Sequence, residues 1–165
     1  MKGTDKFLIG IVAGVVLLVV LAFVIAFLRP APAYQSDTTP EGVAHNYLLA
    51  LQQKDYARAY SYLSPTLIGY PATVEAFIRD VQNNDYAFRR YDASTTSAVE
   101  SAQVTGDRAE VEVRETHFYN NGLFGSDEYT ETFEMQLKRE NGAWKITGYD
   151  RYWANCWTDT TAGCQ

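Results

Sequence analysis

The residue types best suited to acid–base chemistry lie in the second half of the chain. Glu115 and His117 are two positions apart, and Glu131 and Asp150 follow them. In an extended strand, residues two apart point to the same face of the sheet. A histidine, or a carboxyl group that burial removes from water, can be tuned to exchange a proton near neutral pH. These four residues are therefore the candidate catalytic groups.

A two-residue alternation, typical of strands, begins near Phe88 and continues almost to the end of the chain. Gly106-Asp107 and Asn141-Gly142 predict tight hairpin turns within it. The alternation predicts five antiparallel strands, at residues 88–91, 95–104, 109–119, 128–139 and 143–153.

The same alternation predicts which side chains meet. The apolar phase that ends at Val113 continues as Glu115 and His117, while Glu131 and Asp150 share faces with apolar residues of their own strands. The sheet would then bring the four candidates to one region, together with several tyrosines. A β-bulge between Val113 and His117 would turn Glu115 and His117 outward and disperse the cluster.

The alternative is a structural role for these residues. Glu115 and Glu131 would then be solvated charges at the rim, and His117 a hydrogen-bonded residue at the sheet edge. Asp150 would form an ion pair with Arg151 or Arg114. His45 is expected on the surface of a helix. The sequence has no zinc signature, glycine-rich phosphate loop or nucleophile elbow, so we expect no metal and no cofactor.

Helical patterns precede the strands. Thr39 can cap a helix that has Pro40 at its first position, and apolar residues then recur at helical spacing. The pattern predicts three helices, at about residues 40–53, 56–63 and 73–84. Three helices followed by an antiparallel sheet predict an α+β domain in which the helices cover one face of a curved sheet.

Residues 7–28 form a run without charge or proline. As a helix this run would measure roughly 33 Å, enough to cross a bilayer. Because Lys2 and Lys6 precede it, we expect a short cytoplasmic tail at 1–6, a transmembrane helix at 7–28, a stalk linker at 29–39 and an extracytoplasmic domain at 40–153. Ala31-Pro32-Ala33 leaves cleavage after Ala33 as an alternative.

Charge limits the range of partners. The chain has 14 basic and 20 acidic residues; setting aside the first 29 residues, with three basic and one acidic, leaves 11 and 19, a net charge of −8. Nucleic-acid binding requires a concentrated basic patch, so we expect no nucleic-acid partner. The expected membrane contact is the N-terminal helix.

The two cysteines, Cys156 and Cys164, lie in the last ten residues. In an oxidising compartment they would form a disulfide that closes a C-terminal tail at 154–165, contributing about 2–3 kcal/mol. Free thiols and a metal site remain alternatives, although the tail has no histidine.

Aromatic residues are numerous, with 12 Tyr, eight Phe and three Trp. Such side chains bury a large area at low entropic cost, which suits interfaces and surfaces for sugars or small apolar ligands. Candidate pocket or interface residues are Tyr60, Tyr129, Tyr152 and Trp153. Packing of the C-terminal tail against the sheet is the alternative.

Sequence patterns at both ends of the 38–153 region match a known superfamily. They are Thr39-Pro40-Glu41-Gly42-Val43-Ala44, Lys54-Asp55-Tyr56-Ala57, and Asn141-Gly142-Ala143-Trp144-Lys145-Ile146. The chain thereby resembles the nuclear transport factor 2-like superfamily, and most closely its small, anchored, extracytoplasmic members. The resemblance implies a cone whose concave sheet and first helices enclose a pocket, which different members use for catalysis, binding or dimerisation. It specifies the fold and leaves the activity open.

The sequence therefore favours a membrane-anchored, extracytoplasmic binding or assembly domain without evident catalysis. Its partner would be an envelope protein or a small apolar ligand. One alternative is a pocket enzyme of the isomerase or dehydratase kind. The other is a structural homodimer joined through the sheet face, which an exposed apolar sheet face would favour.

Overall fold

The structure, a computed structural model, describes residues 4–28, 32–88, 95–120, 126–149, 151–159 and 161. The chain divides into two compact units, Met1–Pro32 and Ala33–Gln165.

The first unit is the helix α1 (Thr4–Phe27). Its segment Lys6–Ile25 has a mean hydropathy of 3.3, and none of that segment is buried. By length and composition α1 is apolar enough to cross a membrane, a property that it shares with signal sequences.

The second unit begins with the helices α2 (Pro40–Gln52), α3 (Tyr56–Tyr62) and α4 (Val74–Asn83), followed by the single turn α5 (Asp85–Phe88). The side chains of Thr39, Asp55 and Thr73 each accept a hydrogen bond from a backbone N–H in the first turn of α2, α3 and α4, respectively. Capping of this kind satisfies donors that have no partner within the helix. The three predicted helices are therefore present, with a fourth short helix after them.

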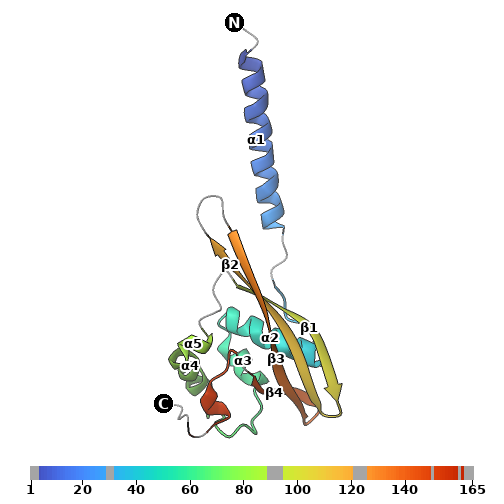
Figure 1. Cartoon of the computed structure of the whole chain (residues 1–165), viewed down its shortest axis with the longest axis vertical. Coiled ribbons are helices and arrows are strands. Elements are labelled where there is room, and N and C mark those ends of the chain that lie inside the picture. Colours follow the sequence, from blue (N-terminus) through green and yellow to red (C-terminus); the bar gives the residue numbers. More distant parts are fainter. Residues whose placement is uncertain are drawn as a thin grey trace. The chain divides into compact units, whose positions relative to one another are not determined.

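Four antiparallel strands follow, in the spatial order β1-β2-β3-β4. They are β1 (Thr95–Thr105), β2 (Arg108–Asn120), β3 (Ser126–Glu140) and β4 (Ala143–Tyr149). The predicted turns join them, with positive φ at Gly106, Asn141 and Gly142. Figure 1 shows the helices of this unit, α2 to α5, gathered on one side of the curved sheet, so the predicted α+β fold is confirmed.

The core lies between the helices and the inner face of the sheet. Every second residue of the central strands is buried there, beginning with Ala109, Val111 and Val113 on β2. Tyr47 of α2 and Phe77 of α4 are fully buried on the helical side. One continuous cluster of buried side chains therefore joins both layers.

Two strand predictions were wrong. Phe88, expected in a strand at 88–91, ends α5, while 89–91 lie outside the described residues. The last strand ends at Tyr149 instead of continuing to Trp153, and Tyr152 has a φ of 56°. That backbone conformation is incompatible with a continuing strand.

The end of the expected stalk packs on the domain. Asn46, a fully buried residue of α2, accepts a hydrogen bond from Gln35 N (2.7 Å) and donates to Gln35 O (2.8 Å) and to Asp37 Oδ1 (2.6 Å). Tyr62 Oη also donates to Asp37, at 2.9 Å. Residues 33–39 therefore belong to the folded unit.

We predict that Asn46→Ala lowers the free energy of unfolding by about 1–3 kcal/mol, because the backbone groups of Gln35 lose their buried partner. Urea unfolding of the full chain in nonionic detergent, followed by tryptophan fluorescence, measures this change. Gln52→Ala, at an exposed position of the same helix, is the control and should change it by less than about 0.5 kcal/mol. Equal effects of the two variants would contradict this account of the stalk.

Candidate functional site

An unbroken strand pairing positions the candidate residues. The register between β2 and β3 runs from Arg108 to Asn120 without a shift, and it places Glu115 directly opposite Glu131. On the other side of β2, the pairing with β1 does contain a bulge, which lies in β1 between Val99 and Ser101. Glu115 therefore stays on the inner face of the sheet, as the alternation predicts.

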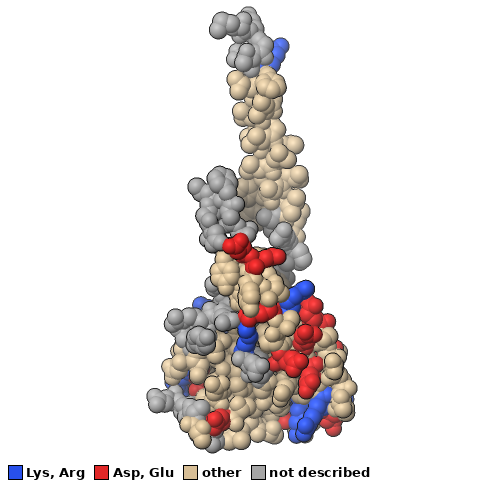
Figure 2. Space-filling model, viewed as in Figure 1, with Lys and Arg blue, Asp and Glu red and all other residues tan. Residues whose placement is uncertain are grey.

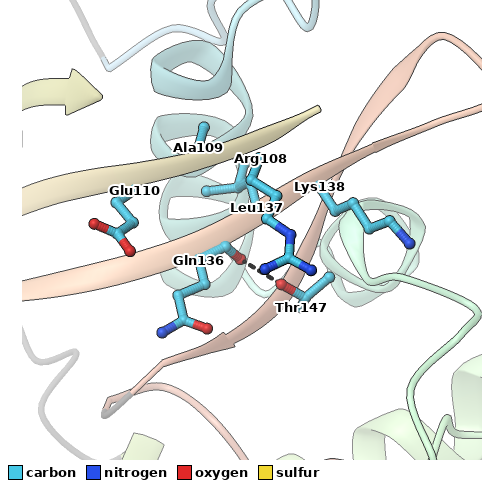
Figure 3. A pocket seen from close by; sticks show the side chains of 7 residues that line it. All are labelled: Arg108, Ala109, Glu110, Gln136, Leu137, Lys138 and Thr147. Atoms are coloured by element: carbon cyan, nitrogen blue, oxygen red, sulfur yellow. Dashed lines mark hydrogen bonds between the residues drawn. The ribbon is translucent and has the colours of Figure 1, made fainter. Parts of the chain in front are cut away.

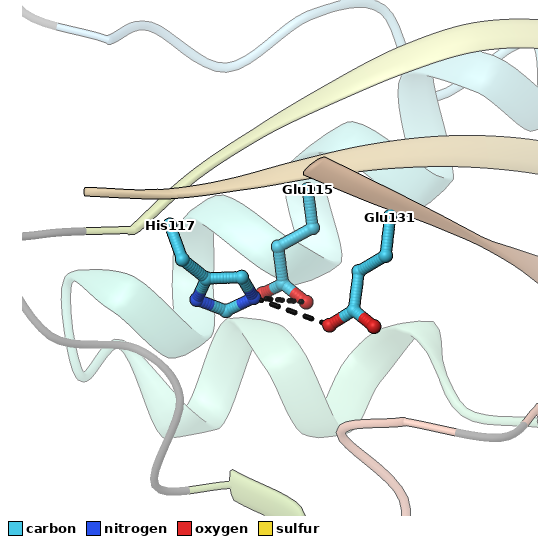
Figure 4. A group of neighbouring side chains, drawn as sticks. All are labelled: Glu115, His117 and Glu131. Atoms are coloured by element: carbon cyan, nitrogen blue, oxygen red, sulfur yellow. Dashed lines mark hydrogen bonds and ion pairs between the residues drawn. The ribbon is translucent and has the colours of Figure 1, made fainter. Parts of the chain in front are cut away.

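His117 lies against both carboxylates, as Figure 4 shows. Its Nε2 is 3.2 Å from Glu131 Oε1 and 3.5 Å from Glu115 Oε2, and its Nδ1 is 3.1 Å from Thr95 Oγ1. The residue is 8% exposed, and Glu115 is completely buried. The interpretation of Glu115 as a solvated rim charge was therefore wrong.

Arg151 supplies the cation that this pair of carboxylates requires. Its guanidinium donates to Glu115 Oε2 at 3.1 Å and to both carboxylate oxygens of Glu131. The hydrogen bonds with Glu131 raise the pKa of the Arg151 guanidinium above its usual range, while burial acts in the opposite direction. The guanidinium carbon also lies 5.9 Å from the centre of the Phe133 ring, within cation–π range.

Tyr152 completes the interior beside Arg151. The residue is fully buried, and its hydroxyl donates to Glu115 Oε1. Its backbone is held from two other elements, because Tyr47 Oη donates to Tyr152 O (2.9 Å) and Tyr152 N donates to Ala87 O (3.2 Å). Tyr152 therefore connects Glu115 on the sheet to helices α2 and α5.

Residues 151–157, which we call the C-terminal segment, continue as buried structure. Trp157 stacks on Phe77 with ring centres 5.3 Å apart and donates its indole N–H to Asp80 Oδ2 at 2.8 Å. Trp153 meets Trp157 edge to face at 4.9 Å. The segment thus fills the space between the helices and the inner face of the sheet.

Not all of the other predicted site residues lie at the cluster. Tyr60 lies away from the cluster and donates its hydroxyl to Pro71 O at 2.8 Å. Tyr129 is exposed and stacks on His117, and Trp153 is buried. Asp150 lies outside the described residues.

The remaining predictions about single residues concern the histidine of α2 and the two cysteines. His45 is half-buried, and its Nε2 is 3.1 Å from Ala33 O. Cys156 is buried, while Cys164 lies outside the described residues, so the disulfide between them stays a prediction.

The cluster also has the composition of a metal site. One ligand atom from each of Glu115, His117 and Glu131 lies within 4.8 Å of the others. A divalent cation at this position would have to displace the guanidinium of Arg151, which already binds both carboxylates. The geometry therefore favours an internal ion-pair network over metal binding.

Sequence reasoning did not identify Arg151 as the partner of these carboxylates. The sequence signal for it is indirect. Two carboxylates directed into one core require a compensating charge. Arg151 is a basic residue that directly follows Asp150, one of the four predicted site residues.

No family model matches the chain, and no curated protein matches it. Solved structures similar to it include a SEC-C motif containing protein from Rhodopseudomonas palustris (18% identity, TM-score 0.44, covering 71% of this chain and 81% of that one). An NTF2-like protein of unknown function from Shewanella oneidensis is similar at 11% identity and TM-score 0.43, covering 64% and 88%. A protein provisionally named a ketosteroid isomerase, from Shewanella frigidimarina, is similar at 17% identity and TM-score 0.45, covering 67% and 93%. At sequence identities this low, the similarity concerns the fold alone and gives no information about activity.

We predict that Arg151→Met lowers the free energy of unfolding by about 3 kcal/mol, because it leaves two facing carboxylates without their cation. In the double variant Glu115→Gln with Arg151→Met, the loss should be smaller than the sum of the two single losses. Urea unfolding of all three variants measures this coupling. Arg114→Met, which breaks an exposed ion pair with Glu100, is the control and should cost less than about 1 kcal/mol. Additive single losses would contradict the network.

Proposed function

We propose that this protein is a membrane-anchored, extracytoplasmic domain that acts by binding or assembly and not by catalysis. The observation that carries the proposal is the occupation of the interior by Arg151 and Tyr152. Two further features support it: the apolar helix α1 and a pair of cysteines suited to an oxidising compartment.

Catalysis needs a proton donor or acceptor that a substrate can reach. Here both oxygens of Glu115 already accept hydrogen bonds, one from Tyr152 and one from Arg151. Both oxygens of Glu131 accept from Arg151 as well. A substrate would have to break this network before either carboxylate could act on it, so the cluster is better suited to holding the fold together.

A pocket enzyme of the isomerase or dehydratase kind is the second candidate. The observation in its favour is that His117 lies within hydrogen-bond reach of Glu131 and stacks on the exposed Tyr129. Histidine and carboxylate groups in such contact can transfer protons in an active site.

A homodimer through the sheet remains a prediction with less support. The outer face of the sheet has exposed polar and charged residues at alternating positions, among them Glu110, Glu112, Thr132 and Glu134. Glu112 and Glu134 are directly opposite each other, a like-charge pair that is unfavourable even in the monomer. This polar surface lacks the apolar character that an interface between obligate subunits usually has.

Reporter fusions test the topology. We expect alkaline phosphatase fused after Gln165 to be active in a bacterial host, because the enzyme matures only after export, and green fluorescent protein at the same point to stay dark. A fusion that lacks residues 1–32 is the control and should reverse both signals. A fluorescent, phosphatase-negative full-length fusion would place the domain in the cytoplasm and overturn the proposal.

The direction of a stability change distinguishes binding from catalysis. Active-site polar groups often reduce stability, so replacing them tends to leave a protein equally or more stable. We predict instead that Glu131→Gln lowers the free energy of unfolding by about 1–3 kcal/mol, because Arg151 loses one of its two ionic partners. Glu128→Gln, at an exposed position of the same strand, should change it by less than about 0.5 kcal/mol. A Glu131→Gln protein as stable as the native chain would favour the pocket enzyme.

A further inference from the structure

Three basic residues stand next to one another across the outer face of the sheet. Arg108 of β2 pairs in register with Lys138 of β3, and Lys138 pairs with Lys145 of β4. Directly opposed like charges on neighbouring strands destabilise a sheet. This row contains three of the 11 basic residues found after position 29, although that part of the chain has a net charge of −8.

The row borders a hollow in the surface. The pairing of β3 with β4 shifts between Gln136 and Leu137, which leaves Thr147 as the extra residue of a β-bulge. Beside this bulge lies a hollow of about 380 Å³, and Arg108, Gln136, Lys138 and Thr147 help to line it. Figure 3 shows the guanidinium of Arg108 next to Thr147, whose hydroxyl donates to Gln136 O at 3.2 Å.

Among the residues that the structure describes, Arg108 and Lys138 have no acidic partner. Within the described part of the chain, neither Arg108 nor Lys138 forms an ion pair, although Arg114 on the same face pairs with Glu100 at 2.7 Å. The ammonium group of Lys145 donates a hydrogen bond to Ser61 O. Glu110 also lines the hollow, but no ion pair joins it to the described basic residues. Figure 2 shows basic side chains near the lower end of the domain, with acidic side chains adjacent to them.

We propose that this hollow binds a small anion that carries a phosphate group. The guanidinium of Arg108 can contact two phosphate oxygens at once, and Lys138 adds a mobile charge. The Gln136 amide is a further donor on the rim. A bound dianion would relieve the repulsion between the facing cations, and the volume lies within the range of small-molecule sites. The site is on the opposite face of the sheet from Glu115 and does not depend on the function proposed for the interior.

A nucleic acid fits the surface less well. A polynucleotide needs basic groups along an extended track, whereas the remaining outer face presents Glu112 and Glu134. A phospholipid headgroup shares the chemistry of a free phosphate, so the test must separate these two sources.

Titration of the isotope-labelled full chain with inorganic phosphate tests the site by NMR, in nonionic detergent at low salt. We expect saturable amide shifts confined to residues 108–110, 136–138 and 145–147. The variant Arg108→Gln with Lys138→Gln should weaken binding at least tenfold, and since both side chains are exposed it should keep the fold. Arg114→Gln removes a charge from the same face without touching the hollow, and it should leave the affinity within twofold.

A second arm distinguishes the source of the phosphate group. In nanodiscs without added phosphate, shifts at the same amides with anionic phospholipid but not with phosphatidylcholine would identify a lipid headgroup as the ligand. Shifts with dissolved phosphate alone would identify a soluble ligand. Shifts that spread over the whole surface without saturating, or equal weakening by the Arg114→Gln control, would overturn the site, because both indicate general charge screening.

Discussion

The guanidinium of Arg151, bound between Glu115 and Glu131, is the contact on which the interior of the domain depends. The pairing of β2 with β3 places the two carboxylates opposite each other on a face that must be buried. Each isolated charge would cost several kcal/mol to remove from water, and the two would repel. One planar guanidinium with five donors can satisfy both carboxylates at once. A cation at this point therefore offsets the cost of closing the inner face over the two carboxylates.

That requirement accounts for the course of the chain after β4. A strand that continued along the sheet edge would carry residue 151 past the carboxylates, whereas β4 ends at Tyr149 and the side chains of Arg151 and Tyr152 reach Glu115. Tyr152 adopts a left-handed backbone conformation that is unfavourable for a bulky residue. Its contacts with Glu115, Tyr47 and Ala87 offset this local strain. Because Tyr152 is held in place, the chain that follows it is positioned so that Trp157 packs on Phe77 and Trp153.

The sequence predicted most of the sheet because local signals determine it. The alternation along β2 is unbroken from Ala109 to His117, and a turn residue with positive φ marks each of the two short hairpins. The end of the last strand was not predictable in this way. Gly148, Asp150 and Tyr152 continue the alternation equally well in the sequence. The strand ends shortly before Arg151, which contacts Glu131, a residue 20 positions earlier in the chain. Alternation likewise indicates the face to which Glu115 points, but not its depth or its cationic partner.

The two faces of the sheet consequently have different roles. The inner face is closed by the protein's own C-terminal segment, whose donors occupy the carboxylates that could otherwise do chemistry. The outer face keeps its charges in water and leaves facing pairs of like charge unrelieved, Glu112 with Glu134 and Arg108 with Lys138. The buried charges already have partners of opposite charge within the protein, whereas these surface charges have none among the residues that the structure describes. A charged ligand could therefore bind more readily at the outer face than in the interior. Binding at the outer face would stabilise this domain by mass action without disturbing its core.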